Sequence, residues 1–230
     1  MVDSFVFNGK SSTDFHLLIS GYGTYRAPSR DVTMKSVAGR DGDLTLDNGR
    51  YKNVDITYKG VIYNSLMPNY RELVAWLLTQ RGYKRLEDTF NPDEFRLGVF
   101  KESIEPKLKG YDAASMQITF NCKPQRYLKI GEEPIEINQT GIVANPTAFE
   151  SRPLIRAYGS GTLSINSKNL VITGVSANDY IDIDSEIMDA FKGTVNLNSK
   201  ISGEFPTLAP GDNEITFNGN LEIIPRWFNL

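Results

Sequence analysis

Three carboxylates, Asp182, Asp184 and Glu186, are spaced two residues apart in a segment that reads as a β-strand. In a strand, residues at this spacing share one face, so the carboxylates would lie together while Ile181 and Ile183 point to the core. Paired carboxylates can hydrolyse glycosides, and several together can bind calcium. The alternative, which we favour, is an acidic solvent-exposed face that discourages edge-to-edge pairing with other strands.

Other catalytic chemistry has few side chains to draw on. The sequence contains one histidine, His16, within the apolar run Phe15–Ile19, and one cysteine, Cys122. We expect His16 to be a packed or half-exposed strand residue. A zinc site of the usual ligand types would then need several carboxylates. The Gly21–Gly23 segment lacks the third glycine and the following helix of a phosphate-binding loop. We therefore expect no catalytic residue, no metal and no cofactor.

The charge distribution suggests two structural units. Residues 1–130 carry 19 Lys and Arg against 15 Asp and Glu, whereas residues 131–230 carry 6 against 13. A shift of this size favours two domains with different surfaces, divided near residue 130. Neither half has the clustered basic residues of a nucleic-acid-binding module. The longest apolar run, Leu73–Leu78, is too short to span a bilayer, so no membrane insertion is expected.

The first half reads as a mixed α+β unit. Alternating segments at Asp31–Val37 and Val54–Tyr63 predict strands, and a 3.6-residue apolar period over 68–80 predicts one helix. The expected apolar stripe of this helix is Tyr70, Leu73, Val74, Leu77 and Leu78, with Trp76 at its flank in the core. Asp41-Gly42-Asp43 and Asp47-Asn48-Gly49 fail the spacing of a calcium loop, and the second is predicted to be a turn.

The second half has the pattern of a β-sandwich, with short alternating segments separated by Gly, Asn, Asp and Pro. In one predicted hairpin Ile165 pairs with Leu170 and Leu163 with Ile172. In the last predicted hairpin, a three-residue loop over 218–220 places all apolar residues on one face. That loop would pair Phe217 with Leu221.

Aromatic residues of the second half could bind sugar. Exposed aromatic rings are the platforms on which a carbohydrate-binding module would depend. The candidates are Tyr158, Tyr180 and Trp227, although each is more simply explained as a core or rim residue. Carbohydrate binding to host-wall glycans is therefore the alternative function for this chain, and a carboxylate glycosidase is a third.

In their order, several segments resemble the distal tail (Dit) proteins of long-tailed bacteriophages. They include Phe5-Val6-Phe7-Asn8-Gly9, Ala27-Pro28-Ser29-Arg30, Val37 with Gly39-Arg40-Asp41-Gly42, Trp76-Leu77, and the run from Phe120 to Tyr127. The second half resembles the family more loosely, at Asn145-Pro146-Thr147, Arg152–Ile155 and Tyr158–Gly161.

The resemblance implies a mostly β fold with one helix. An N-terminal ring-forming α+β domain (1–130) would precede a galectin-like or carbohydrate-module-like β-sandwich (131–230). It further implies a non-enzymatic structural protein of the virion tail tip, assembled in the bacterial cytoplasm as a hexameric ring. Its partners would be the tail tube protein, the hub or tape-measure protein and a receptor-binding protein, and DNA would pass through the ring without specific binding.

The charged loop from Pro28 to Asp41 is the expected contribution to a ring interface, because stiff turns present fixed partners. Contacts in a ring are head-to-tail, so two different patches of each subunit must be complementary. Arg30 and Arg40 could pair with carboxylates of a neighbouring copy. The candidate interface residues are Arg30, Asp31, Gly39, Arg40, Asp41 and Gly42. The alternative is that residues 39–42 form only a tight hairpin turn.

Overall fold

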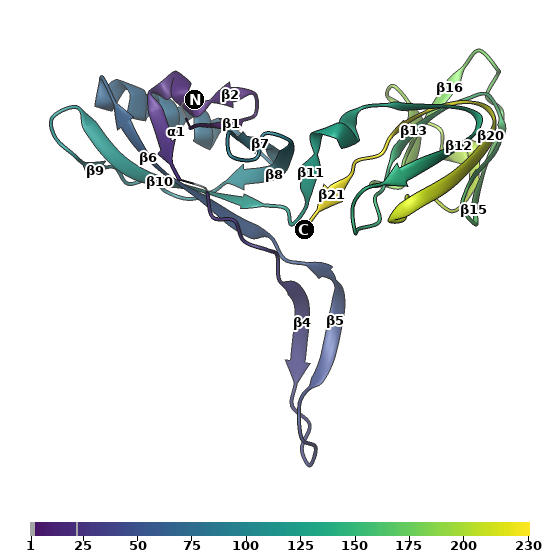
Figure 1. Cartoon of the computed structure of the whole chain (residues 1–230), viewed down its shortest axis with the longest axis horizontal. Helices are drawn as coiled ribbons and strands as arrows, with labels where there is room; N and C mark the ends of the chain where they lie inside the picture. The colour runs from purple at the N-terminus through teal and green to yellow at the C-terminus, as the bar shows by residue number, and fades with distance from the viewer. Residues whose placement is uncertain (1–2, 22) are drawn as a thin grey trace. The chain divides into compact units, whose positions relative to one another are not determined.

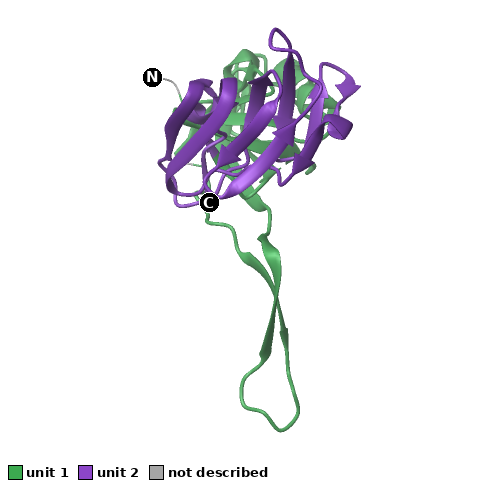
Figure 2. Ribbon diagram, turned by 90° about the vertical axis from the view of Figure 1, so that its right-hand side faces the viewer, with its two compact units in different colours: residues 1–126, 230 green, residues 127–229 purple. Residues whose placement is uncertain are grey.

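A computed structural model describes residues 3–21 and 23–230. Its contacts divide the chain into two compact units (Figure 2), here called unit 1 (residues 1–126 and 230) and unit 2 (residues 127–229). The chain thus divides after Arg126, whereas the sequence analysis placed the division after residue 130. Each unit has its own hydrophobic core.

Unit 1 is built on an antiparallel sheet with the strand order β2-β1-β7-β8-β10-β6-β3 (Figure 1), and the short β9 adds to β10. The strands of this unit are β1 (Phe5–Phe7), β2 (Lys10–Ser11), β3 (Leu17–Ser20), β6 (Val54–Tyr63), β7 (Lys84–Asp88), β8 (Glu94–Phe100), β9 (Lys107–Leu108) and β10 (Ala113–Cys122). Burial alternates strictly along β10, so one face of the sheet is in the core and the other is not.

Helix α1 (Leu66–Thr79) covers the core face together with the 3₁₀ turn η1 (Ser12–Phe15). As predicted, Trp76 is a core residue: it is 9% exposed, and its ring stacks on Phe15 with centroids 4.8 Å apart. Leu78 was predicted to belong to the apolar stripe, and this is wrong, because the side chain is 61% exposed. The buried face is instead formed by Leu66, Leu73, Trp76 and Leu77.

The first turn of α1 is capped from a distant loop. Ser65 has left-handed backbone geometry (φ 53°) and makes no side-chain cap. Asp112 takes its place: its two carboxylate oxygens accept hydrogen bonds from the backbone N–H groups of Ser65 and Leu66, each at 2.7 Å. A carboxylate at this position satisfies free N–H groups and complements the helix dipole.

Strands β4 (Arg30–Lys35) and β5 (Leu44–Tyr51) pair only with each other and form a two-stranded arm. Nearly all of its residues are exposed, and Figure 1 shows it as a long hairpin. The predicted turn at Asp47-Asn48-Gly49 is wrong, because these residues lie within β5. The register shifts there as a β-bulge, in which Gly49 has φ +67° and donates its N–H to Asp47 Oδ1.

Unit 2 is a curled antiparallel sheet with the strand order β18-β17-β16-β13-β20-β14-β15-β19, and β12 pairs with β20. Its strands are β12 (Ile135–Asn145), β13 (Leu154–Tyr158), β14 (Gly161–Ile165), β15 (Lys168–Ile172), β16 (Tyr180–Asp184), β17 (Asp189–Lys192), β18 (Val195–Asn196), β19 (Ile201–Gly203) and β20 (Gly211–Ile224). The short segments β11 (Arg126–Leu128), η2 (Lys129–Glu132), η3 (Asn198–Lys200) and β21 (Phe228–Asn229) complete the described elements.

The predicted final hairpin does not exist. Residues 211–224 form one continuous strand, β20, which pairs with β12 on both sides of an irregularity at residues 217–219. Odd-numbered residues stay on the buried face from Asn213 through Phe217 to Ile223, so no turn is needed to keep the apolar side chains together. Gly219 is required by close packing rather than by a turn, because a Cβ there would lie 2.5 Å from the carbonyl oxygen of Tyr158.

The other predicted hairpin exists in a different register. Leu163 pairs with Leu170 and Ile165 with Lys168 across a two-residue turn. Asn166, in that turn, has φ +53°. The prediction that Ile165 pairs with Leu170 is therefore wrong by two residues. A two-residue shift preserves the face of every side chain, and all four apolar residues are buried.

The predicted mostly β fold with one α-helix is confirmed for the described part of the chain. Within residues 3–21 and 23–230, no helix has the length and apolar character that crossing a membrane requires.

Candidate interaction surfaces

The three candidate catalytic carboxylates are each paired with an arginine. Arg156 binds Asp182 through Nε–Oδ1 (2.8 Å) and Nη2–Oδ2 (3.1 Å). Arg226 also binds its carboxylate, Asp184, with two hydrogen bonds, through Nη1–Oδ1 (2.7 Å) and Nη2–Oδ2 (2.8 Å), and its Nη1 lies 3.6 Å from Glu186. Asp182 and Asp184 are 6% and 7% exposed, so the predicted acidic solvent-exposed face is wrong. The two carboxylates are buried halves of bidentate ion pairs.

The pKa of Asp184 reflects this pairing. Burial alone would raise the pKa, but the hydrogen bonds and positive charge of Arg226 more than offset burial, and the pKa is lowered. Asp184 is therefore ionised at neutral pH and cannot serve as a general acid. The arrangement supports packing of unit 2 rather than proton transfer.

The isolated histidine and cysteine are not placed for catalysis. His16 is exposed at the end of η1, with φ +53° and its ring edge-on to Tyr63, and it is not the strand residue we predicted. Cys122 is fully buried, and burial raises the pKa of its thiol to about 12. A protonated buried thiol is a weak nucleophile. In the Gly21–Gly23 segment, Tyr22 lies outside the described residues.

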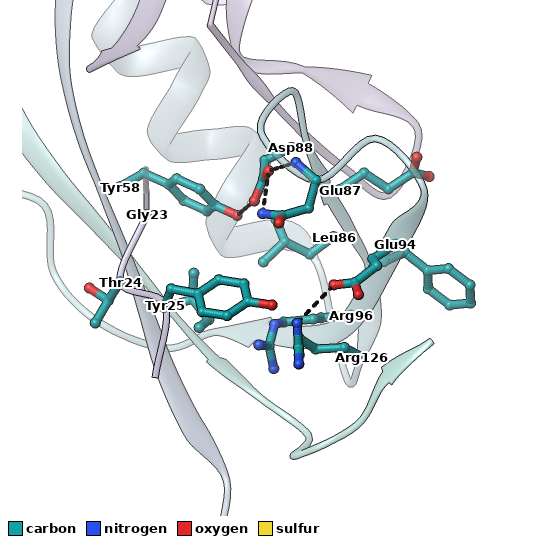
Figure 3. A pocket seen from close by; sticks show the side chains of 13 residues that line it. Gly23, Thr24, Tyr25, Tyr58, Leu86, Glu87, Asp88, Glu94, Arg96 and Arg126 are labelled. Carbon is teal, nitrogen blue, oxygen red and sulfur yellow. Dashed lines mark hydrogen bonds and ion pairs between the residues drawn. The ribbon is translucent and has the colours of Figure 1, made fainter. Parts of the chain in front are cut away.

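A small pocket of about 30 Å³ lies in unit 1 beside Tyr58 and Arg96 (Figure 3). Tyr58 donates its hydroxyl hydrogen bond to Asp88 Oδ2 at 2.8 Å, and burial followed by the Asp88 charge raises the pKa of Tyr58. Arg126 pairs with Glu94 at 3.2 Å. The pocket has room for only one or two water molecules. We interpret this cluster as a structural support for β6, β7 and β8.

Two of the six candidate interface residues stabilise the base of the arm. Arg30 pairs with Asp47 at 3.0 Å, across the two strands. Asp31 is buried and accepts a hydrogen bond from Arg50 Nε at 2.7 Å. This hydrogen bond and the positive charges of Arg50 and Lys52 hold the pKa of Asp31 below its usual value. These charges are therefore used within the chain.

The other four candidates lie at the tip of the arm, in the loop 36–43. Gly39 and Gly42 both have φ +77°, a conformation that favours glycine. Arg40 and Asp41 are exposed, and neither side chain has an ion pair among the described residues. The tip is thus a longer loop rather than a tight turn. It presents one positive charge, on Arg40, and two exposed negative charges, on Asp41 and Asp43.

The candidate sugar-binding aromatics separate into two groups. Trp227 is 3% exposed and packs on Gly131, so its ring is a core side chain. Tyr158 and Tyr180 lie side by side on β13 and β16, with ring centroids 6.1 Å apart. The Tyr158 hydroxyl donates a hydrogen bond to Glu222 Oε1 at 2.6 Å, and this raises the pKa of Tyr158.

The sequence analysis missed the polar residues around these tyrosines. Arg156 lies over the Tyr180 ring at 4.3 Å, and Glu222 and Asn220 come from β20. Their alternation with buried residues is visible in the sequence, but their proximity depends on strand pairing. In the described part of the chain, no group of three or more His, Cys, Asp or Glu side chains is arranged to hold a metal ion.

Neither protein-family models nor curated protein sequences match this chain. Its structure, however, is similar to the crystal structure of the Dit protein (gp 19.1) of SPP1, described as a paradigm of the hub adsorption apparatus in phages that infect Gram-positive bacteria. The TM-score is 0.76, and the match covers 97% of this chain and 97% of that chain at 13% sequence identity. The chain has a Dit-like fold. The resemblance inferred from the sequence is thus confirmed at the level of the fold, over both units.

Proposed function

We propose that this Dit-like chain is a non-enzymatic structural protein of a phage tail tip. Copies would assemble through unit 1 into a hexameric ring that connects the tail tube to the baseplate and the host-adsorption apparatus. The observation that carries this proposal is the similarity to SPP1 Dit across 97% of both chains. The arrangement of the carboxylates, His16 and Cys122 supports a role without catalysis.

The arm supplies the physical argument for self-assembly. Its exposed surface includes large apolar side chains, with Met34 58% and Leu46 47% exposed. Register places Leu44 and Leu46 on one face of the arm and Met34 on the other. Apolar residues on both faces of a thin hairpin favour burial against another surface. We assign that surface to a neighbouring copy of unit 1.

The tip charges would then orient the neighbouring copy. Arg40 and Asp41 have no ion pair within the described chain, so both are free to pair in an assembly. Gly39 and Gly42 allow the loop its left-handed turns, and Arg30 and Asp31 stiffen its base. Of the six candidate residues, we therefore propose direct contacts for Arg40 and Asp41 and supporting roles for the others.

The remaining partners follow from the proposed position in the virion. The ring would contact the tail tube protein on one side and the hub or tape-measure protein on the other, and a receptor-binding protein would attach to it. Assembly would occur in the bacterial cytoplasm, without insertion into a membrane. DNA would pass through the channel without specific binding, because every retained phosphate contact would add salt-dependent affinity.

Sedimentation velocity of the purified full chain tests the proposal. We expect a species of six times the 25.8 kDa chain mass. Arg40→Glu should shift the distribution toward monomer, and the matched charge reversal Arg81→Glu, at another exposed arginine, should leave the ring intact. A wild-type chain that stays monomeric at every concentration contradicts self-assembly. If the Arg40→Glu variant still forms the ring, the tip of the arm is not part of the interface.

A further inference from the structure

The outward face of unit 2 carries two parallel rows of polar side chains. Strand pairing aligns Glu136, Glu222, Arg156 and Asp182 in one row across β12, β20, β13 and β16. The same register aligns Asn138 with Asn220 in the next row, where Tyr158 and Tyr180 are also paired. The residues between them along each strand, such as Ile137, Leu221, Ala157 and Ile181, are buried.

Part of this face is held rigid by its own contacts. Arg156 is fixed by its two hydrogen bonds to Asp182 and by its position over the Tyr180 ring. Glu222 is fixed through Oε1 by the Tyr158 hydroxyl, and its Oε2 lies 4.0 Å from Arg156. The Tyr158 ring is therefore anchored at its hydroxyl end, as a preorganised platform should be.

Other polar side chains on the same face are available to bind a ligand. Glu136, Asn138 and Asn220 are exposed, and within the described chain they have no hydrogen-bond partner for their side chains. Together with Tyr158, Leu221 and Glu222 they line an open pocket of about 190 Å³. The pocket thus combines an aromatic ring, two carboxamides and two carboxylates.

We propose that this pocket binds a neutral saccharide unit, a pyranose with adjacent free hydroxyl groups. Carboxamides and carboxylates can each bond a pair of neighbouring hydroxyls, and the carboxamides can also donate. The aromatic ring offers an apolar surface for the C–H face of the sugar. A few polar groups that fix orientation beside an aromatic wall are typical of small-molecule sites.

The charges of the pocket select against acidic sugars. Glu136 and Glu222 both line it, whereas Arg156, the nearest cation, is already paired with Asp182. A ligand carboxylate would meet two like charges without a free cation to balance them. Neutral pyranoses are therefore expected to bind, and their uronic acid counterparts are not.

Saturation-transfer difference NMR on the full chain tests the site, since it detects weak sugar binding to monomers and large assemblies alike. The probes are D-glucose, D-galactose, N-acetyl-D-glucosamine and D-glucuronate. We expect a signal from at least one neutral sugar, stronger than that from glucuronate. Asn138→Ala and Asn220→Ala should each weaken the binding of that sugar about tenfold, because each variant removes the hydrogen bonds of one side chain to the sugar.

Asn218→Ala is the matched control, because Asn218 is exposed on the same strand but does not line the pocket. Circular dichroism should show that all three variants remain folded. The proposal is overturned if none of the neutral sugars gives a signal, if glucuronate gives as strong a signal as the best neutral sugar, or if the signal of that sugar is unchanged in both pocket variants. The saccharide site does not depend on ring assembly. A negative NMR result would therefore contradict only the saccharide site, and a negative sedimentation result would contradict only the ring.

Discussion

Arg226 holds Asp184 through two parallel hydrogen bonds of 2.7 and 2.8 Å, and it does so from a left-handed backbone conformation (φ +56°). The carboxylate comes from the end of β16, and the arginine follows β20, 42 residues further along the chain. The pair is partly buried, with side-chain exposures of 24% for Arg226 and 10% for Asp184. It joins two segments of unit 2 that are far apart in the sequence.

Arg226→Met should destabilise unit 2 by about 3–5 kcal/mol, because it leaves the buried charge of Asp184 without a partner. Replacing both residues, as Arg226→Met with Asp184→Asn, should restore much of the loss, since the buried charge at position 184 is removed as well. Urea unfolding followed by Trp227 fluorescence in a Trp76→Phe background reports on unit 2 alone. Equal unfolding free energies for the single variant and the parent would contradict the assigned role.

The same pair predicts an acid-sensitive unit 2. The pKa of Asp184 is lowered in the folded chain, so its contribution to stability is complete above the ordinary aspartate pKa of about 4 and is lost as pH falls through the folded-state value. The unfolding free energy of unit 2 should therefore decrease between about pH 5 and pH 2. The Arg226→Met, Asp184→Asn double variant should show a shallower decrease. An identical pH profile in both proteins would assign the acid sensitivity to other carboxylates.

Substitution of two adjacent leucines of α1 should lower the stability of unit 1 to very different extents. Leu77 is fully buried, so Leu77→Ala is expected to cost about 2–5 kcal/mol through lost contacts and a residual cavity. Leu78 is 61% exposed, so Leu78→Ala should change stability by less than about 0.5 kcal/mol. Urea unfolding followed by Trp76 fluorescence in a Trp227→Phe background compares them. Similar losses for both would mean that an assembly buries Leu78 or that the helix is rotated.

Asp112 should stabilise unit 1, although it lies outside the helix that it caps. Asp112→Ala removes both acceptors for the first N–H groups of α1 and should cost about 1–2 kcal/mol. Asp112→Asn keeps one acceptor oxygen and should cost less. Asp93→Ala, at another exposed loop aspartate, is the control in the same urea titration. If Asp112→Ala and Asp93→Ala unfold at the same urea concentration as the parent, the cap contributes nothing.

Local patterns in the sequence predicted the elements well where one face of a strand or helix meets a core. The strand Val54–Tyr63 and the core position of Trp76 were both expected, because alternation and helical period depend only on neighbouring residues. The buried residues of β20 also obey their period, yet the predicted turn at Asn218-Gly219 was wrong. Alternation can continue through a glycine, and only the nearby Tyr158 carbonyl explains why that glycine is there.

The candidate site could be predicted only in part. Tyr158, which lines the pocket, was identified from its residue type. Glu222, Asn138 and Asn220 were not, since they reach the pocket from other strands. The sequence by itself determined a β-rich chain with one helix and a charged segment between Pro28 and Asp41, and the structure showed that this segment belongs to an arm. Only the tertiary structure decided that Asp182 and Asp184 are paired with arginines and that a polar pocket forms beside Tyr158. Partners and register are set by contacts between residues far apart in the chain, and no local pattern encodes them.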